Sequence, residues 1–238
     1  MMATQRNHLL EQFFNSLISG DRAGARDVVD QVLEADCPAP RVLSHLFWPA
    51  LEQIQNLYRH DQLTALAYQY ATRLLRQLAD QMQLRLEQGD RNGTTVLVAS
   101  GDEQSEELAA QMAADLLEAD GYTVYFVGGG VANDEIVEQL GHLNAEKLVI
   151  FGAVAQTVPY TRLLIDRLHD IGACPKLQVV VGGGVFNRAD GLAEEIGADL
   201  WAKDPAELVE LLQEQPQRRM TSDQRTVGRR RRAASDAA

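Results

Sequence analysis

The chain has 238 residues, of which 45% are hydrophobic, and a formal net charge of −12. This length allows one large or two small domains, and a domain of about 150 residues buries roughly 70% of its surface. No stretch reaches the roughly 20 apolar residues of a membrane span, and residues 1–14 lack the apolar core of a secretion signal. Two cysteines, Cys37 and Cys174, are too few for a disulfide framework. We therefore expect a soluble cytoplasmic protein without membrane association.

The charge is unevenly distributed along the chain. Seven arginines against two aspartates give residues 216–238 a charge of +5, so the rest of the chain carries −17. A body this acidic repels phosphates, so direct nucleic-acid binding is not expected outside the arginine-rich tail. The tail, 215–238, has almost no apolar residues and is expected to be disordered. Its run Arg229–Arg232 suits an acidic partner or RNA, although a solvated extension without a partner is the favoured interpretation.

Residues 1–88 show the apolar periodicity of helices only and are expected to form a four-helix bundle. The first helix ends at Gly20, and the Cys-Pro-Ala-Pro segment at 37–40 ends the second. Pro49 predicts a kink or a fresh start in the third helix. The fourth helix is expected from about residue 63 to residue 87.

A polar, glycine-containing linker at 88–93 precedes a second domain, expected at 94–214. In this domain apolar strands alternate with amphipathic helical stretches, which predicts a parallel sheet covered on both faces. Five such strands are typical of a flavodoxin-like (Rossmann-type) α/β fold, which binds ligands beyond the carboxyl ends of its strands. The expected strands are Thr94–Ala99, Thr123–Val127, Lys147–Gly152, Leu177–Val181 and Leu200–Ala202.

Several weak motifs occur in a specific order along both domains. They are the bundle segment Leu46–Leu51, Asp102 after the first strand, Gly182–Gly184 after the fourth, and Ile196–Asp199 before the last. Their order and spacing resemble the corrinoid-binding module of methionine synthase, of methanogenic corrinoid proteins and of cobalamin-dependent photoreceptor regulators. The resemblance covers nearly the whole chain outside the tail, and it implies cobalamin as the cofactor.

The resemblance also shows where a metal ligand is missing. In that family the first strand-to-helix loop carries Asp-x-His-x-x-Gly, and the His replaces the cofactor's own base under cobalt. Here the matching positions hold Asp102, Gln104 and Glu107. An amide is a poor cobalt ligand, and Asp102 has no imidazole to orient. We therefore expect no metal ligand from the protein, and a cofactor that could bind with its own base on cobalt.

Glycines occupy the positions that the resemblance assigns to the cofactor's nucleotide tail. Gly152 replaces the Ser of the family's Ser-x-Leu, and Gly182 and Gly183 match its Gly-Gly pair. Without side chains these residues allow a ligand to approach the backbone closely. The alternative is that they serve only tight strand-to-loop turns.

The bundle shows a similar departure. Photoreceptor relatives place Trp-x9-Glu-His over the upper cobalt face, and the matching residues here are Tyr58, Tyr68 and Gln69. The tyrosines could stack on a flat ring, or they could be ordinary bundle residues. His45 and His60 could ligate a metal in a rearranged pocket, although surface or packing roles are favoured.

The sequence contains no convincing catalytic set, so catalysis is not expected. The acidic run at 102–107 is better explained as favourable charge in the first turn of a helix than as an acid/base pair. Our leading hypothesis is a cobalamin-binding sensor or regulatory module that acts through a protein partner. The alternatives are a ligand-free interaction scaffold, a corrinoid carrier for methyl transfer, and a protein that binds haem or another tetrapyrrole. A homo-oligomer is compatible with the sequence.

Overall fold

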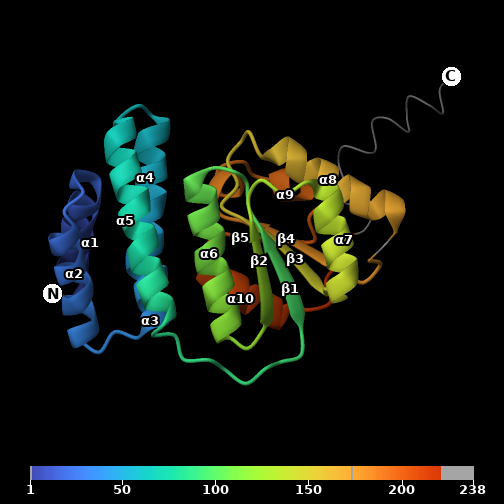
Figure 1. Cartoon of the computed structure of the whole chain (residues 1–238), viewed down its shortest axis with the longest axis horizontal. Coiled ribbons are helices and arrows are strands. Elements are labelled where there is room, and N and C mark those ends of the chain that lie inside the picture. The colour runs from blue at the N-terminus through green and yellow to red at the C-terminus, as the bar shows by residue number, and fades with distance from the viewer. Residues whose placement is uncertain (1, 173, 221–238) are drawn as a thin grey trace. The chain divides into compact units, whose positions relative to one another are not determined.

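The computed structural model describes residues 2–172 and 174–220 (Figure 1). The chain forms two compact units, Met1–Glu87 and Gln88–Ala238. The first unit is helical and the second contains a parallel sheet with helices on its faces. Within the described ranges no helix is both long enough and apolar enough to cross a bilayer.

The helical unit follows the expected pattern with one shorter helix. The Asp21 carboxylate accepts from the Gly24 amide at 3.0 Å, and Thr64 accepts from the Ala67 amide at 3.2 Å, so both residues act as N-caps. A π-helical turn, Leu43–Phe47, joins two helices just before Pro49, where the missing amide interrupts the regular bonding pattern. The helices are α1 (Met2–Ser19), α2 (Arg22–Glu34), α3 (Ala39–Val42), α4 (Trp48–Arg59) and α5 (Ala65–Gln83).

The sheet unit has five parallel strands in the order β2-β1-β3-β4-β5. This order confirms the predicted flavodoxin-like fold. All strands are parallel, and the chain adds β2 on one side of β1 and the later strands on the other side, so the switch point of the sheet lies between β1 and β3. The strands lie within one residue of their predicted bounds because their apolar runs end at polar or glycine residues. They are β1 (Thr95–Ala99), β2 (Thr123–Gly128), β3 (Lys147–Phe151), β4 (Gln178–Gly182) and β5 (Leu200–Ala202).

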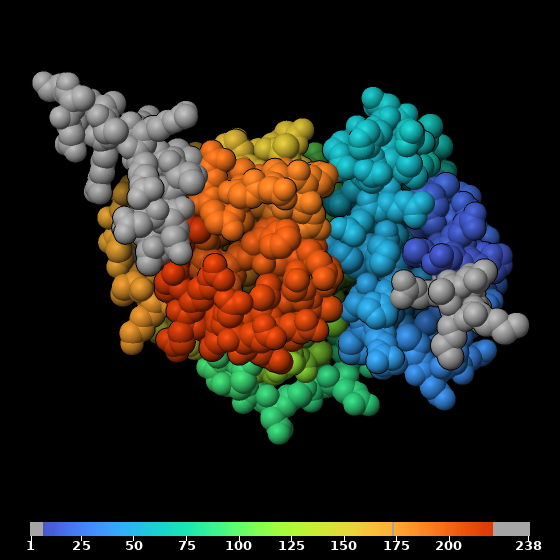
Figure 2. Space-filling view, turned by 180° about the vertical axis from the view of Figure 1, so that it is seen from behind, coloured from blue at the N-terminus to red at the C-terminus, as the bar shows by residue number. Residues whose placement is uncertain are grey.

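Helices cover both faces of the sheet, and strand alternation shows which side chains meet which helices. Leu97, Leu148 and Val179 belong to one core with α7, α8 and α9, so the alternate residues Val96 and Val149 face α6 and α10. Figure 2 shows α10 in red packed against its orange neighbours on the face seen from behind. The helices are α6 (Gln104–Ala119), α7 (Asn133–Leu143), α8 (Val158–Ile171), α9 (Leu192–Ile196) and α10 (Pro205–Glu214).

The chain after α10 stays bound to the sheet unit up to the end of the described residues. The Nε2 of buried Gln178 donates to the carbonyl oxygens of Gln215 and Arg218, both at 2.9 Å. The Asp199 carboxylate accepts from the Met220 amide at 2.6 Å. The expectation of disorder from residue 215 onward is therefore wrong for residues 215–220. The buried Gln178 amide needs acceptors, and the backbone carbonyls of this segment provide them. The arginine run of the tail lies outside the described residues.

A buried lysine lies beneath this segment. Lys147 is only 4% exposed, and its Nζ donates to Gln178 Oε1 at 2.8 Å and to the Pro216 carbonyl at 3.3 Å. Burial lowers the pKa of Lys147, the nearby Arg219 lowers it further, and Glu146 opposes the change. The folded protein therefore binds this proton less tightly than the unfolded chain does.

This lowered pKa predicts a pH dependence of stability. Between the folded-state pKa of Lys147 and its unfolded value of 10.5, the unfolded chain binds more protons, so the free energy of unfolding rises with pH. We expect Lys147→Met to remove this rise and Lys176→Met, at an exposed lysine, to retain it. Urea unfolding of the sheet unit at pH values from neutral to about 10 would measure both slopes. Parallel slopes for the wild type and Lys147→Met would contradict the assignment.

Candidate functional site

A pocket of about 600 Å³ opens at the carboxyl ends of β1 and β3. It lies between the loops that follow β1, β2 and β3, at the point of the sheet where doubly wound folds bind ligands. Its floor is apolar and comprises Ala99, Ile136, Ile150 and Leu164. Polar side chains surround the opening, among them Asp102, Asn133, Gln156, Thr157 and Tyr160.

The electrostatics of the pocket limit what it can bind. Asp102, Glu103 and Glu106 contribute carboxylates, whereas none of the described residues that line the pocket is Lys, Arg or His. Carboxylates accept hydrogen bonds and repel anions. The pocket therefore suits neutral molecules with amide or hydroxyl donors, or cations, and disfavours phosphates.

Glu106 connects two of the loops around the pocket. It is fully buried, and its Oε1 accepts from the Val154 amide at 2.8 Å and from the Thr157 hydroxyl at 2.6 Å. Its Oε2 accepts from the Glu103 amide at 3.2 Å as part of a capping box at the start of α6. Of the acidic run, Glu106 and Glu107 lie in the first turn of α6 and Glu103 is its N-cap, whereas Asp102 precedes the helix. The three-residue spacing of Glu103 and Glu106 is a sequence signal for the capping box. The bonds from Glu106 to the distant β3–α8 loop have no such signal in the sequence.

Asp102 makes the second connection between loops. Its Oδ1 accepts from the Gly130 amide at 2.5 Å, which joins the loop after β1 to the loop after β2. Gln104 lies two residues further on as the first residue of α6 and is half-buried. Asp102 and Glu106 together thus fix the relative positions of all three loops that form the pocket.

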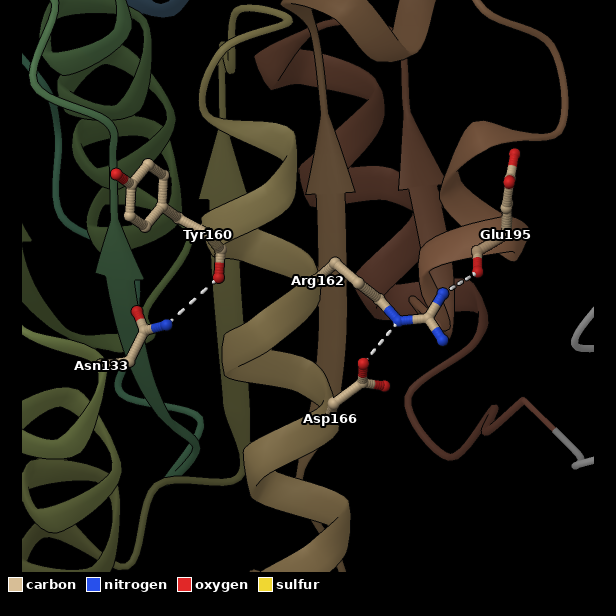
Figure 3. A network of polar contacts seen from close by, with 5 residues as sticks. All are labelled: Asn133, Tyr160, Arg162, Asp166 and Glu195. Carbon is tan, nitrogen blue, oxygen red and sulfur yellow. Dashed lines mark hydrogen bonds and ion pairs between the residues drawn. The ribbon is translucent and has the colours of Figure 1, made fainter. Parts of the chain in front are cut away.

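Helices α7, α8 and α9 are joined by a polar network that sequence reasoning did not identify (Figure 3). Asn133 donates to the Tyr160 carbonyl at 3.2 Å, which joins the first turns of α7 and α8. Two residues further along α8, Arg162 donates to Asp166 at 2.8 Å and to the Glu195 carbonyl at 2.6 Å. Figure 3 shows the Tyr160 ring pointing away from Arg162. This ring is 67% exposed at the edge of the pocket and is available to a ligand.

Two of the three predicted glycine positions, Gly152 and Gly182, are closely packed by the protein's own atoms. A Cβ on Gly152 would lie 2.3 Å from the Ala109 Cβ, on the side of the sheet that α6 covers. A Cβ on Gly182 would lie 2.3 Å from Phe151 Cε2 and 2.5 Å from a β5 carbonyl oxygen. The Gly183 amide donates to that same carbonyl at 2.9 Å. Close packing within the chain therefore accounts for Gly152 and Gly182, since neither borders open space.

The bundle candidates lie in the helical unit, and two of them stack on each other. The rings of Tyr58 on α4 and Tyr68 on α5 stack with centroids 4.1 Å apart. Tyr68 is 5% exposed, whereas Tyr58 is 41% exposed and could offer its outer face to a ligand. Gln69 follows Tyr68 and is half-buried. In the described part of the chain no cluster of His, Cys, Asp and Glu side chains could hold a metal ion.

Comparison with known proteins assigns the family. Two family models, each described as a B12 binding domain, match residues 9–83 and residues 94–210. The chain belongs to the B12 binding domain family. The match covers both structural units and confirms the resemblance drawn from the motifs.

Individual relatives within this family are methylamine corrinoid proteins. "Monomethylamine corrinoid protein 2" of Methanosarcina acetivorans is 21% identical over 206 residues, which are 84% of this chain and 93% of that protein. "Dimethylamine corrinoid protein 3" of Methanosarcina mazei is 26% identical over 103 residues, or 43% of this chain. The solved Methanosarcina barkeri monomethylamine corrinoid protein aligns with a TM-score of 0.75 and 17% identity, covering 87% of this chain and 98% of that one. This structural similarity confirms the fold.

Proposed function

We propose that this protein binds a corrinoid and carries it for a partner protein in methyl transfer. The observation that supports the proposal is the match of both units, in order, to methylamine corrinoid proteins over more than nine-tenths of their length. These relatives support the carrier hypothesis better than the sensor hypothesis. The regulatory role has no support among them.

The pocket at the carboxyl edge provides suitable chemistry for the periphery of a corrin ring. Corrinoids carry neutral amide side chains around an apolar macrocycle, and amides both donate and accept hydrogen bonds. Asp102 and Gln156 on the opening can accept and donate such bonds, and the Tyr160 ring can pack against an apolar edge. The corrinoid itself would supply the cobalt that holds a methyl group.

The residues in the lower-ligand and nucleotide positions do not fit a corrinoid held through a protein histidine. Gln104 offers an amide where the resemblance implies an imidazole, and Asp102 is already bonded to the Gly130 backbone. The space beside Gly152 and Gly182 is filled by Ala109 and Phe151. We therefore derive no step that needs a cobalt bond from this chain.

A second candidate function is the ligand-free interaction scaffold. The filled glycine positions favour it, because a chain that no longer binds the cofactor would be free to pack these sites closely. It predicts that the protein retains no corrinoid under any condition.

Cobalt retention separates these two functions. The purified full-length protein would be incubated with excess methylcobalamin in the dark and dialysed extensively, and cobalt would be measured against protein. The carrier proposal predicts about one cobalt per chain and transfer of the methyl group to a thiol acceptor or a methyltransferase. Cobalt at the level of a non-binding control protein would favour the scaffold and refute the carrier.

A further inference from the structure

We infer that this protein holds its corrinoid with the cofactor's own base still bound to cobalt, and that the nucleotide stays outside the sheet unit. The inference rests on the proposed function and specifies the form of the cofactor that the site accepts. Three independent features of the sheet unit support it.

The first feature is the absence of an imidazole at the carboxyl edge of the sheet. From Gln88 to the end of the sequence the chain has only two histidines, His142 and His169. Both lie in the last turns of their helices, α7 and α8. Because helices run antiparallel to the strands in this fold, these turns lie at the opposite edge of the sheet from the pocket. No histidine of the sheet unit can therefore take the place of the cofactor's base.

The second feature is the filled face of the sheet under α6. The resemblance implies a nucleotide groove beside Gly152 and Gly182, but Ala109 occupies the position next to Gly152. Phe151 is fully buried and lies against Gly182, where a single added carbon would come within 2.3 Å. Entry of a nucleotide would require the displacement of a core aromatic ring, which close-packed interiors resist.

The third feature is charge. The nucleotide loop of cobalamin contains a phosphodiester, and the loops at this edge present the carboxylates of Asp102, Glu103 and Glu106 with no basic residue in the described pocket lining. Asp102 and Glu106 also hold the loops together through the bonds to Gly130, Val154 and Thr157. A phosphate that entered here would meet repulsion and would have to break these connections.

Electron paramagnetic resonance of the bound Co(II) cofactor tests the inference directly. An axial nitrogen splits the cobalt lines into triplets if it is ¹⁴N and into doublets if it is ¹⁵N. We expect cob(II)alamin with a ¹⁵N-labelled base to give doublets on the full-length protein. Uniform ¹⁵N labelling of the protein with an unlabelled cofactor should leave triplets. Triplets that turn into doublets only on labelling the protein, or lines without nitrogen splitting, would overturn the inference.

Two variants and one analogue strengthen the test. Gln104→Ala should leave the visible spectrum of bound methylcobalamin unchanged. Gln104→His should also remain in the base-on form, because Asp102 and Phe151 keep their contacts. Conversion to a histidine-bound form would show that the groove is open and refute the inference.

Cobinamide, which lacks the nucleotide, should bind with a dissociation constant within about threefold of that of cobalamin. A loss of affinity much larger than this would place the nucleotide inside the protein. If no corrinoid binds at all, the proposed function fails together with the inference, whereas binding in a base-off form overturns only the inference.

Discussion

Replacement of Glu106 by Ala is expected to destabilise the sheet unit by about 3–5 kcal/mol. The substitution removes a fully buried carboxylate and leaves the Val154 amide, the Thr157 hydroxyl and the Glu103 amide without their acceptor. A donor left unpaired away from water costs about 1–3 kcal/mol, and these three donors are part-buried. Glu106→Gln retains one oxygen acceptor and should lose less. Both variants should also loosen the loop after β3, and with it the pocket.

Trp201 fluorescence during urea unfolding would report on this change. The chain has two tryptophans, one in each unit, so a Trp48→Phe background leaves Trp201 of β5 as the probe of the sheet unit. Glu138→Ala provides the control, because Glu138 is exposed on α7 and makes only a long 3.9 Å ion pair with His142. This control should change stability by less than about 0.5 kcal/mol. Equal effects of the two alanine substitutions would show that Glu106 does not hold the loops together.

Gly182→Ala is expected to destabilise the same unit by about 1–3 kcal/mol in the absence of any ligand. The new carbon would lie 2.3 Å from the Phe151 ring and 2.5 Å from the Ala202 carbonyl oxygen. The aromatic ring could shift, but the Ala202 carbonyl is part of the β5 backbone and is held in place by pairing with β4 at this position. Phe151→Leu in the same chain should recover part of the lost stability, because it relieves only one of the two contacts.

Gly141→Ala is the matched control, and its expected effect has the opposite sign. Gly141 lies within α7 with no atom near its added carbon, and alanine favours a helix over glycine by about 1 kcal/mol. Urea unfolding followed by Trp201 fluorescence would measure both variants. If Gly182→Ala left stability unchanged and lowered only corrinoid affinity, the space beside Gly182 would be a ligand groove and the packing interpretation would be wrong.

The fold could be predicted from the sequence because its signals are local. Apolar runs such as Val96–Ala99 and Val179–Val181 end at polar or glycine residues, and the Asp21 cap and the break at Gly20 mark helix ends directly. The last bundle helix was predicted too long. Leu84 and Leu86 continue the apolar pattern, yet the helix ends at Gln83 and Leu84 is 86% exposed.

The candidate site could be predicted only in part, because its connections join residues far apart in sequence. The position of Asp102 after β1 followed from the strand pattern, but its bond to Gly130 did not. The spacing of Glu103 and Glu106 indicated a helix start, but not that Glu106 reaches the loop after β3. Glycines at 152 and 182 suggested open space, and only the packing of Ala109 and Phe151 shows that the space is filled. Side-chain packing of this kind leaves no local sequence pattern.

Calorimetric titration of the purified full-length protein with hydroxocobalamin, with an absorbance spectrum recorded at each step, tests the central claim most directly. Haemin, titrated in parallel, would separate corrinoid binding from general tetrapyrrole binding. Our account predicts saturable corrinoid binding at about one cofactor per chain, with the spectrum of a cofactor that keeps its own base on cobalt. No saturable change up to tens of micromolar cobalamin would contradict the account and leave the ligand-free scaffold as the better description of this protein.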